Sequence, residues 1–200
     1  MANAALGRCA SQITPRLYLS DYWSARDAEK LQALGITHVL SVMDIVPQIP
    51  EIIPASQRLH ISIQDVANAD LLKHLETTTA FIVAALDENL TNKVLVHCMM
   101  GISRSATVVC AYLVATTEMT AAVSISYVQE LRPVVCPNLG FRQQLEDYGT
   151  RFVKQKPRPS QIVVFPEGLK LTSIAARIRK LKGINSKGSI EAPNPAKAVT

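Results

Sequence analysis

Apolar and polar positions divide residues 13–154 into short buried strands that alternate with helices. Runs of apolar residues and strict alternation, both typical of strands, occur at residues 13–19, 36–42, 58–63 and 93–97. Helical spacing of apolar residues follows them, at residues 24–34, 71–86, 106–114, 120–131 and 137–152. Strands that alternate with helices predict a three-layer α/β domain, in which helices flank a central, mostly parallel sheet.

Residues that start and stop helices predict several of the boundaries. Ser24 is expected to cap the first helix and Gly35 to end it. Asp70 or Asn68 is the expected cap of the second helix, and Thr120 is the expected cap of a later one. The last helix should present one apolar face, made by residues three or four positions apart: Phe141, Leu145, Tyr148 and Phe152.

The most informative stretch joins the fourth strand to the helix that follows it. The strand ends in His97 and Cys98, and after five intervening residues come Arg104 and Ser105. A tight loop between a strand and a helix N-terminus directs backbone N–H groups at one point and forms an anion site. Gly101 permits a backbone turn that a side chain would obstruct. The stretch therefore predicts an anion site that holds a cysteine and an arginine.

The residue types in this loop favour nucleophilic chemistry on a phosphate group. A helix N-terminus and a fixed guanidinium favour the thiolate form of Cys98, which is a strong nucleophile. The planar fork of Arg104 matches two phosphoryl oxygens, and the hydroxyl of Ser105 is placed to hydrogen-bond the sulfur and ease its departure. Loop N–H groups are expected to stabilise the charge of a phosphoryl group in transfer. The substrate-binding positions are Met99, Met100, Gly101, Ile102, Ser103 and Arg104.

This loop resembles the signature of cysteine-dependent protein phosphatases, a cysteine and an arginine separated by five residues. The fuller dual-specificity form is matched by His97, Cys98, Gly101, Ser103, Arg104, Ser105, Ala106 and Thr107. Residues 13–42 also resemble the opening of such domains. A later pattern extends the resemblance to residue 154: Arg132, Pro133, Pro137, Asn138, Phe141, Gln144 and Leu145. The chain is similar to a small, atypical dual-specificity phosphatase.

The resemblance implies a protein-tyrosine-phosphatase-like fold and hydrolysis of phosphotyrosine, phosphoserine and phosphothreonine in proteins. A cysteinyl-phosphate would form on Cys98, without a cofactor or a metal. The general acid of the family lies just after the third strand, which assigns that role to Asp65. Asp70 is the competing candidate, although a helix cap explains it. The resemblance also gives supporting roles to His97 and to Asn138, which is expected to brace the loop, to cap the last helix, or to do both.

Two other functions stay open at this point. One is a phosphate-binding module without turnover, although such relatives lose the cysteine that this chain keeps. The other is a phosphatase for a non-protein substrate, such as an RNA 5′-phosphate or a sugar phosphate. The loop has Met100 where many family members have alanine, and Arg104 is its basic residue. The lack of further basic residues disfavours phosphoinositide and polyphosphate substrates.

Charge separates a tail from the rest of the chain. The expected parts are an N-terminal arm at 1–12, the catalytic domain at 13–154 and a tail at 155–200. Residues 156–200 hold nine basic and two acidic residues and so carry +7, and the chain total of +5 leaves −2 for residues 1–155. The hydrophobic fraction of the chain, 48%, is ample for a core.

The tail is expected to be basic and partly disordered, with one candidate amphipathic helix whose apolar face would hold Leu171, Ile174, Ile178 and Leu181. Such a helix suits an acidic partner such as a protein kinase, or peripheral contact with an anionic membrane. No signal peptide or transmembrane segment is evident, and nucleic acid is not an expected partner. The oligomeric state is not indicated. A reactive thiol suits a reducing setting, so the expected location is the cytoplasm, the nucleus or both.

Three further cysteines, Cys9, Cys110 and Cys136, show no metal-binding spacing. Cys110 is expected in the core, and the other two are expected near loops. In the resembled family a second cysteine can trap the oxidised nucleophile as a disulfide. The sequence leaves open whether one of the three does so with Cys98.

Overall fold

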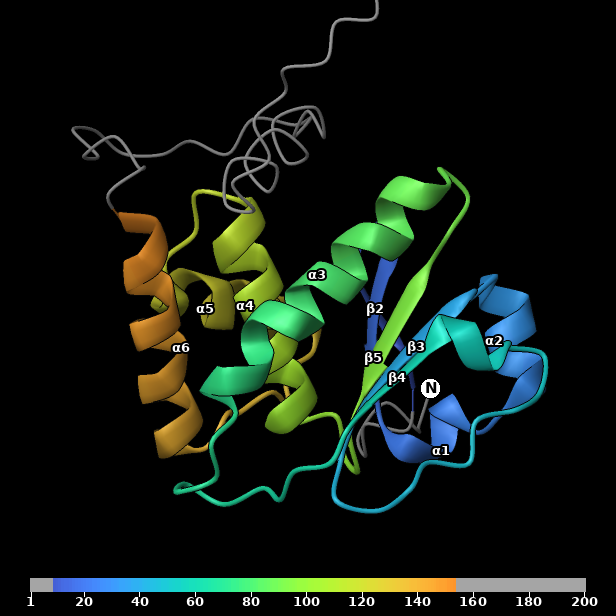
Figure 1. Ribbon diagram of the computed structural model, residues 1–200, viewed down its shortest axis with the longest axis horizontal. Helices are drawn as coiled ribbons and strands as arrows, with labels where there is room; N and C mark the ends of the chain where they lie inside the picture. Colours follow the sequence, from blue (N-terminus) through green and yellow to red (C-terminus); the bar gives the residue numbers. More distant parts are fainter. Residues whose placement is uncertain (1–8, 154–200) are drawn as a thin grey trace, which may run out of the picture. The chain divides into compact units, whose positions relative to one another are not determined.

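A five-stranded sheet forms the middle layer of the part of the chain that the computed structural model describes, residues 9–153 (Figure 1). The strand order is β1-β2-β5-β3-β4, which places β5 in the centre. Strand β1 is antiparallel to β2, and the other neighbours are parallel. The predicted, mostly parallel sheet is therefore confirmed. Its strands are β1 (Ser11–Thr14), β2 (Leu17–Ser20), β3 (His38–Val42), β4 (Arg58–Ile61) and β5 (Val94–His97).

Helices cover both faces of the sheet and complete the three predicted layers (Figure 1). One face carries the short helices α1 (Tyr22–Ala25) and α2 (Ala28–Leu34). The other face carries α3 (Leu72–Glu88), α4 (Arg104–Thr116), α5 (Ala121–Leu131) and α6 (Leu139–Val153). Helix α4 contacts α3, α5 and α6, and all of its residues are buried. Between residues 9 and 153, no helix combines the length and the apolar character that crossing a bilayer needs.

The prediction of a single strand over 13–19 is wrong, because the chain reverses inside this range. Pro15 and Arg16 form a turn between β1 and β2, and Thr14 pairs with Leu17 across it. Apolar residues lie on both sides of the turn, so the hydrophobic pattern alone did not reveal it. The hairpin adds the antiparallel edge strand β1 to an otherwise parallel sheet.

The prediction of one helix over 24–34 is also wrong, since two helices with separate caps occupy this region. Asp21 accepts a hydrogen bond from the backbone N–H of Ser24 at 2.7 Å and starts α1. Asp27 accepts one from a backbone N–H in the first turn of α2 at 3.1 Å. Aspartate caps helices as well as serine does, so the two aspartates define the starts. Gly35 ends α2 in the left-handed conformation, with φ of 69°, as predicted.

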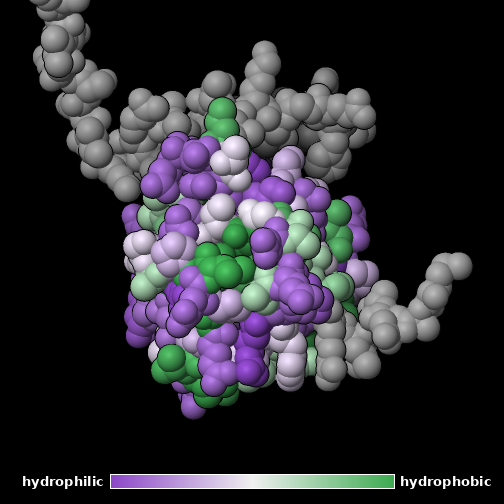
Figure 2. Space-filling view, turned by 90° about the vertical axis from the view of Figure 1, so that its right-hand side faces the viewer, coloured by the Kyte–Doolittle hydropathy of each residue, from purple (hydrophilic) through white to green (hydrophobic). Residues whose placement is uncertain are grey.

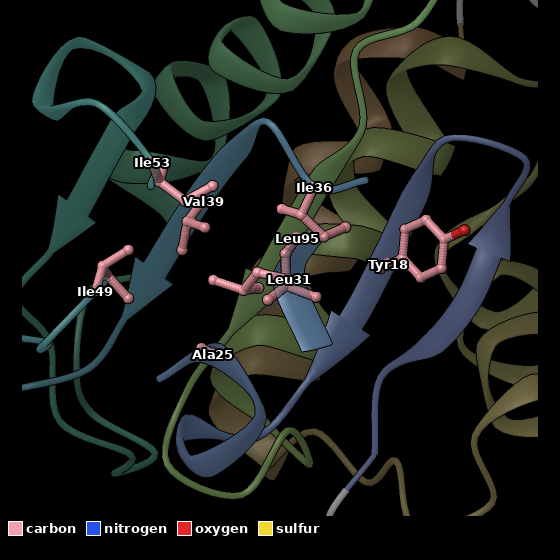
Figure 3. Packing of buried hydrophobic residues seen from close by; sticks show 8 residues of the cluster. All are labelled: Tyr18, Ala25, Leu31, Ile36, Val39, Ile49, Ile53 and Leu95. Carbon is pink, nitrogen blue, oxygen red and sulfur yellow. The ribbon is translucent and has the colours of Figure 1, made fainter. Parts of the chain in front are cut away.

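The side of the molecule that carries α1 and α2 is mainly hydrophilic outside, with hydrophobic side chains in small groups (Figure 2). Beneath it, one buried cluster joins the sheet to these helices and to the loop after β3 (Figure 3). Its members are Tyr18, Ala25, Leu31, Ile36, Val39, Ile49, Ile53 and Leu95. The adjacent strand residues Leu40 and Val96 are fully buried as well. Successive side chains of a strand point to opposite faces, so these two pack toward the layer of α3 to α6.

Capping side chains hold the starts of the later helices. Thr120 accepts from the backbone N–H of Val123 at 3.3 Å and starts α5, as predicted. Asp70 accepts from the backbone N–H of Lys73 at 3.2 Å near the start of α3, which favours it over Asn68. The predicted apolar face of α6 is confirmed, because its four members are buried: Phe141, Leu145, Tyr148 and Phe152.

The remaining predictions for the chain concern residues outside 9–153. They include most of the expected arm and the tail at 155–200. The candidate helix face also lies outside the described residues: Leu171, Ile174, Ile178 and Leu181. These statements stay predictions.

Candidate active site

The loop that follows β5 lies in the middle of the carboxyl edge of the sheet, where parallel α/β sheets bind their ligands. This cradle loop, residues 98–103, turns at Gly101, whose φ is 67°. A Cβ atom at Gly101 would lie 2.5 Å from the carbonyl oxygen of Ser20 and 2.8 Å from Nη2 of Arg132. Both the positive φ and this close approach therefore require glycine.

Four consecutive carbonyl groups of the cradle loop accept hydrogen bonds from outside the loop. The donors belong to α1 and to the segment between α5 and α6. The bonds are Tyr22 N–H to Met99 O (3.2 Å), Arg132 Nη2 to Met100 O (3.3 Å), Arg132 Nε to Gly101 O (3.0 Å) and Cys136 N–H to Ile102 O (2.9 Å). In a planar trans peptide the N–H points away from the preceding C=O. Carbonyls held outward therefore turn the next N–H groups inward, which forms a cradle for an anion.

The thiol of Cys98 lies within this cradle and accepts two hydrogen bonds. Its Sγ accepts from the backbone N–H of Gly101 at 3.2 Å and from the hydroxyl of Ser105 at 3.1 Å. The residue is 1% exposed. Both donors point at the sulfur, and the N-terminus of α4, which begins at Arg104, adds partial positive charge beside it. The structure thus brings the predicted nucleophile and Ser105 into contact.

Arg104 extends a buried guanidinium along the cradle. Its Nη1 donates to Oδ1 of Asp44 at 3.0 Å and to the carbonyl oxygen of Ile63 at 3.1 Å. Its Nε is buried and makes no hydrogen bond, and it lies 3.6 Å from Oδ2 of Asp65. A buried N–H group without a partner is costly, so Nε is available to an anion in the cradle.

Asp44 is a site residue that the sequence analysis missed. Hydrogen bonds from its own backbone N–H and from Arg104 hold the pKa of the Asp44 carboxyl below its usual value. The carboxylate therefore stays ionised at neutral pH and fixes the guanidinium from the side of β3. Its position just after a buried strand, at the edge where ligands bind, was the available sequence signal.

Asp65 lies beside the cradle loop, where the resemblance predicted the general acid. Its Oδ1 accepts from the hydroxyl of Ser103 at 2.7 Å and from Nδ2 of Asn138 at 2.9 Å. The competitor Asp70 instead binds Lys73, through the backbone N–H at 3.2 Å and through Nζ at 3.7 Å. Contact with the cradle favours Asp65 for the acid role, which stays a prediction.

Asn138 connects Asp65, the cradle loop and helix α6. Besides its bond to Asp65, its backbone N–H donates to Oγ of Ser103 at 3.1 Å. Its Oδ1 accepts from the backbone N–H of Phe141 at 2.9 Å. Asn138 is therefore in place to brace the loop and caps α6 at the same time.

Two further residues of α6 dock the segment that carries Asp65. The side-chain amide of Gln144 donates to the carbonyl oxygen of Ala69 at 2.8 Å, and its oxygen accepts from two backbone N–H groups at the start of α3, each at 2.8 Å. A Cβ atom at Gly140 would overlap the carbonyl oxygen of Ala67. This contact requires glycine there, although its φ is ordinary.

His97 supports the cradle from within the core. Its Nδ1 lies 3.3 Å from the carbonyl oxygen of Cys98, and its Nε2 lies 2.6 Å from Oγ of Ser41. A carbonyl only accepts, which places the proton on Nδ1 and leaves Nε2 to accept from the serine hydroxyl. The ring stacks on Tyr22 at 6.3 Å. Burial lowers the pKa of His97 to about 4, so the ring is neutral at neutral pH.

The other cysteines lie apart from this chemistry. Cys110 is in the core, as predicted, and burial raises the pKa of its thiol to about 12. Cys9 and Cys136 are exposed, and all four cysteines are free of disulfide bonds. Within the described residues, no group of His, Cys, Asp and Glu side chains is arranged to hold a metal.

A buried thiol in a cradle of N–H groups, next to a guanidinium and at the carboxyl edge of an α/β sheet, defines a cysteine-dependent phosphate site. Comparison with known proteins identifies the family. The sequence matches the model of the dual specificity phosphatase catalytic domain over residues 17–151. The chain belongs to this family, which confirms the resemblance stated above.

Individual relatives agree with this assignment. Dual specificity protein phosphatase 22 of Xenopus tropicalis is 34% identical over 150 residues, which cover 75% of this chain and 69% of that protein. A Slingshot protein phosphatase homologue of Xenopus laevis is 38% identical over 153 residues. That match covers 76% of this chain but 21% of the relative, so the chain spans about a fifth of the Slingshot protein. A similar fold occurs in the crystal structure of a human tyrosine phosphatase-like serine/threonine/tyrosine-interacting protein, with a TM-score of 0.66 and 34% sequence identity. The match covers 73% of this chain and 99% of the human chain.

Replacement of Arg132 should weaken the cradle. Arg132 is 2% exposed and also donates to the carbonyl oxygen of Cys9 at 2.9 Å. In Arg132→Lys, one ammonium group replaces the planar fork, so the two loop carbonyls lose their fixed orientation. We expect the Kd for inorganic phosphate, measured by calorimetry, to rise by about tenfold or more. The matched control is Arg142→Lys, because Arg142 binds the carbonyl of Pro137 and no carbonyl of the cradle loop. Equal phosphate affinity in the two variants would contradict the bracing role.

His97 should make stability depend on pH in the acid range. Its pKa is lower in the folded chain, about 4, than in the unfolded chain, 6.5. Its contribution is therefore complete above pH 6.5 and is lost as the pH falls toward 4. Between pH 7 and pH 5 we expect His97 to lower the free energy of unfolding by about 2 kcal/mol.

Urea titrations of the wild type and of His97→Gln at both pH values measure this effect. Burial also lowers the pKa of His38 and His74, but both remain in the variant, so the difference between the proteins isolates His97. The same pH dependence in both proteins would show that His97 is not buried in its neutral form.

Proposed function

We propose that this protein hydrolyses phosphotyrosine, phosphoserine and phosphothreonine in proteins through a cysteinyl-phosphate intermediate. One observation carries the proposal, the meeting of three groups in the cradle: the hydrogen-bonded thiol of Cys98, the inward N–H groups and Nε of Arg104, which makes no hydrogen bond. Membership of the dual-specificity phosphatase family supports the same activity and the same breadth of substrate.

The phosphoryl group would bind as an anion within the cradle loop. Its oxygens accept from the inward backbone N–H groups of residues 100–103 and from Arg104, while Asp44 keeps the guanidinium in place. These donors are fixed before the substrate arrives, so they stabilise the charge of the transition state without reorganising. The side chains of Met99, Met100 and Ile102 add no charge.

In the first step the thiolate of Cys98 attacks phosphorus in line with the departing oxygen. A sulfur–phosphorus bond forms, and the electron pair of the breaking phosphorus–oxygen bond goes to the leaving oxygen. Asp65 donates the proton that this oxygen needs. A bound phosphoryl group competes with Asp65 for Arg104, whose Nε lies 3.6 Å from Oδ2 of that carboxyl.

In the second step water hydrolyses the cysteinyl-phosphate. The carboxylate of Asp65 removes a proton from the attacking water, and the electron pair of the sulfur–phosphorus bond returns to the sulfur. The hydroxyl of Ser105, at 3.1 Å, hydrogen-bonds the departing thiolate of Cys98. Inorganic phosphate leaves, and the enzyme returns to its starting state.

Three variants test this mechanism. Cys98→Ser should abolish turnover of aryl phosphate and of phosphopeptides, measured as phosphate release with EDTA present. Asp65→Asn should lower kcat on phosphoserine and phosphothreonine peptides by roughly 10²- to 10⁴-fold, and less on an aryl phosphate, whose leaving group needs little protonation. Asp70→Asn is the matched control, because Asp70 binds Lys73 and not the cradle loop.

The outcomes separate the alternatives. A loss in Asp70→Asn with normal turnover in Asp65→Asn would assign the acid role to Asp70. A wild type that binds inorganic phosphate but hydrolyses neither aryl phosphate nor phosphopeptides would contradict the enzyme and favour a phosphate-binding module.

We also propose that residues 155–200 bind an acidic surface of a protein partner, such as a protein kinase, in the cytoplasm or the nucleus. The support is electrostatic, since residues 156–200 carry +7. Replacing four basic residues by glutamate should weaken binding to a kinase bait by about tenfold or more, and raised salt should weaken wild-type binding. These residues are Arg177, Arg179, Lys180 and Lys182. Unchanged binding by the variant would contradict this role of the tail.

A further inference from the structure

Large hydrophobic side chains gather around the cradle. Among residues 9–153, ten large hydrophobic residues are exposed, and six of them form what we call the apolar rim. The rim consists of Trp23, Ile45, Val46, Val66, Met100 and Leu139, which are between 42% and 82% exposed. Figure 1 shows that α1, the loops after β3 and β4 and the start of α6 all reach the lower edge, where β5 ends. Figure 2 shows hydrophobic side chains at the lower edge of the face it presents.

Hydrogen bonds tie the rim to the cradle loop. Met100 belongs to the loop itself, and every other rim residue lies within two positions of a residue that the cradle binds. The neighbours are Tyr22, which donates to Met99 O; Asp44, which binds Arg104; Asp65, which accepts from Ser103; and Asn138, which donates to Ser103. These bonds, which are between 2.7 and 3.2 Å long, hold the rim residues around the site from four separate segments.

The loop segments at this edge carry carboxylates and no basic residue. Residues 43–49, 62–71, 98–103 and 133–138 contain Asp44, Asp65 and Asp70 and neither lysine nor arginine. Two of the three carboxylates pair with cations of the adjacent helices, Asp44 with Arg104 and Asp70 with Lys73. Arg26 follows Trp23 by three positions, and its guanidinium lies over the ring of Tyr22 at 5.1 Å. An acidic residue beside a phosphorylated residue would therefore meet carboxylates here.

We infer that the preferred substrates carry bulky apolar residues on either side of the phosphorylated residue. This inference rests on the proposed function. Cys98 is 1% exposed, so the phosphorylated side chain must enter the cradle and the chain on either side of it must cross the rim. Apolar neighbours then bury surface against the rim, whereas acidic neighbours are repelled by the carboxylates. The substrate itself is thus the occupant of this surface.

A set of matched phosphopeptides tests the inference on the full-length protein. The peptides share one phosphotyrosine and differ in the two residues on each side, which are leucine, serine or glutamate. We expect kcat/KM for the leucine peptide to exceed that for the serine peptide by about tenfold, and the glutamate peptide to be the poorest substrate. Turnover of a small aryl phosphate, which has no flanking residues, is measured beside them.

Two rim residues test where the preference arises. In the double variant Val46→Ser and Leu139→Ser, the ratio of kcat/KM between leucine and serine peptides should fall from about tenfold to below about threefold. A ratio within each protein cancels any general change in activity. The matched control is Leu90→Ser, because Leu90 is 84% exposed and precedes β5 at the opposite edge of the sheet. It should keep the wild-type ratio.

The outcomes distinguish this inference from the proposed function. Equal kcat/KM for all peptides, with normal aryl phosphate turnover, overturns the inference and leaves the phosphatase intact. A leucine preference that persists in the double variant also overturns it. An inert wild type overturns the proposed function instead. A membrane-facing rim would give a different set of results. The full-length protein would sediment with phosphatidylcholine vesicles, the double variant would not, and the peptides would show no preference. That outcome would show the inference to be wrong.

Discussion

The outward orientation of four loop carbonyls is the constraint on which the site depends. Arg132 supplies two of the donors, and backbone N–H groups of Tyr22 and Cys136 supply the others. A buried guanidinium is costly without acceptors. The loop carbonyls supply acceptors to Arg132, and Arg132 in turn fixes the orientation of those carbonyls. The same side chain binds the carbonyl of Cys9 and the hydroxyl of Ser11. The edge hairpin, the end of α5 and the cradle loop are therefore stabilised together.

The charged groups of the site also depend on a single arginine. In the described structure one guanidinium, Arg104, faces two carboxylates, Asp44 at 3.0 Å and Asp65 at 3.6 Å. Asp44 is hydrogen-bonded and holds the arginine, whereas Asp65 is held by Ser103 and Asn138 and only approaches it. A phosphoryl anion would thus displace the weaker of two pairings. Asp44 would then still hold the arginine, and Asp65 would be released for its proposed role as proton donor.

The residue spacing predicted the contiguous part of the site, and the family resemblance added Asp65 and Asn138, whereas Asp44 and the bracing role of Arg132 were missed. Cys98, Arg104 and Ser105 lie in one short stretch, the cradle loop and the first turn of α4, so their spacing already implies a common point. Asp44 and the bracing role of Arg132 depend on strand order and on packing across more than 30 residues, which periodicity does not contain. Errors in helix boundaries came from the choice of capping residue. Asp21 and Asp27 cap two helices where Ser24 was expected to cap one. Strong periodicity, as on α6, gave a reliable element.

Helix α6 connects Asp65 to the end of the described chain. Its start holds Asp65 and Ser103 through Asn138, and it ends at Val153, from which the basic residues 154–200 continue. Fifteen hydrogen-bonded residues form a rod about 22 Å long, and the buried face of α6 gives it little freedom to bend. In the proposed mechanism, a displacement of about 1 Å along the rod would change proton transfer from Asp65 before it changed phosphate binding, because alignment of the acid tolerates less error than charge attraction does. Events at the far end of the helix would thus reach kcat rather than KM.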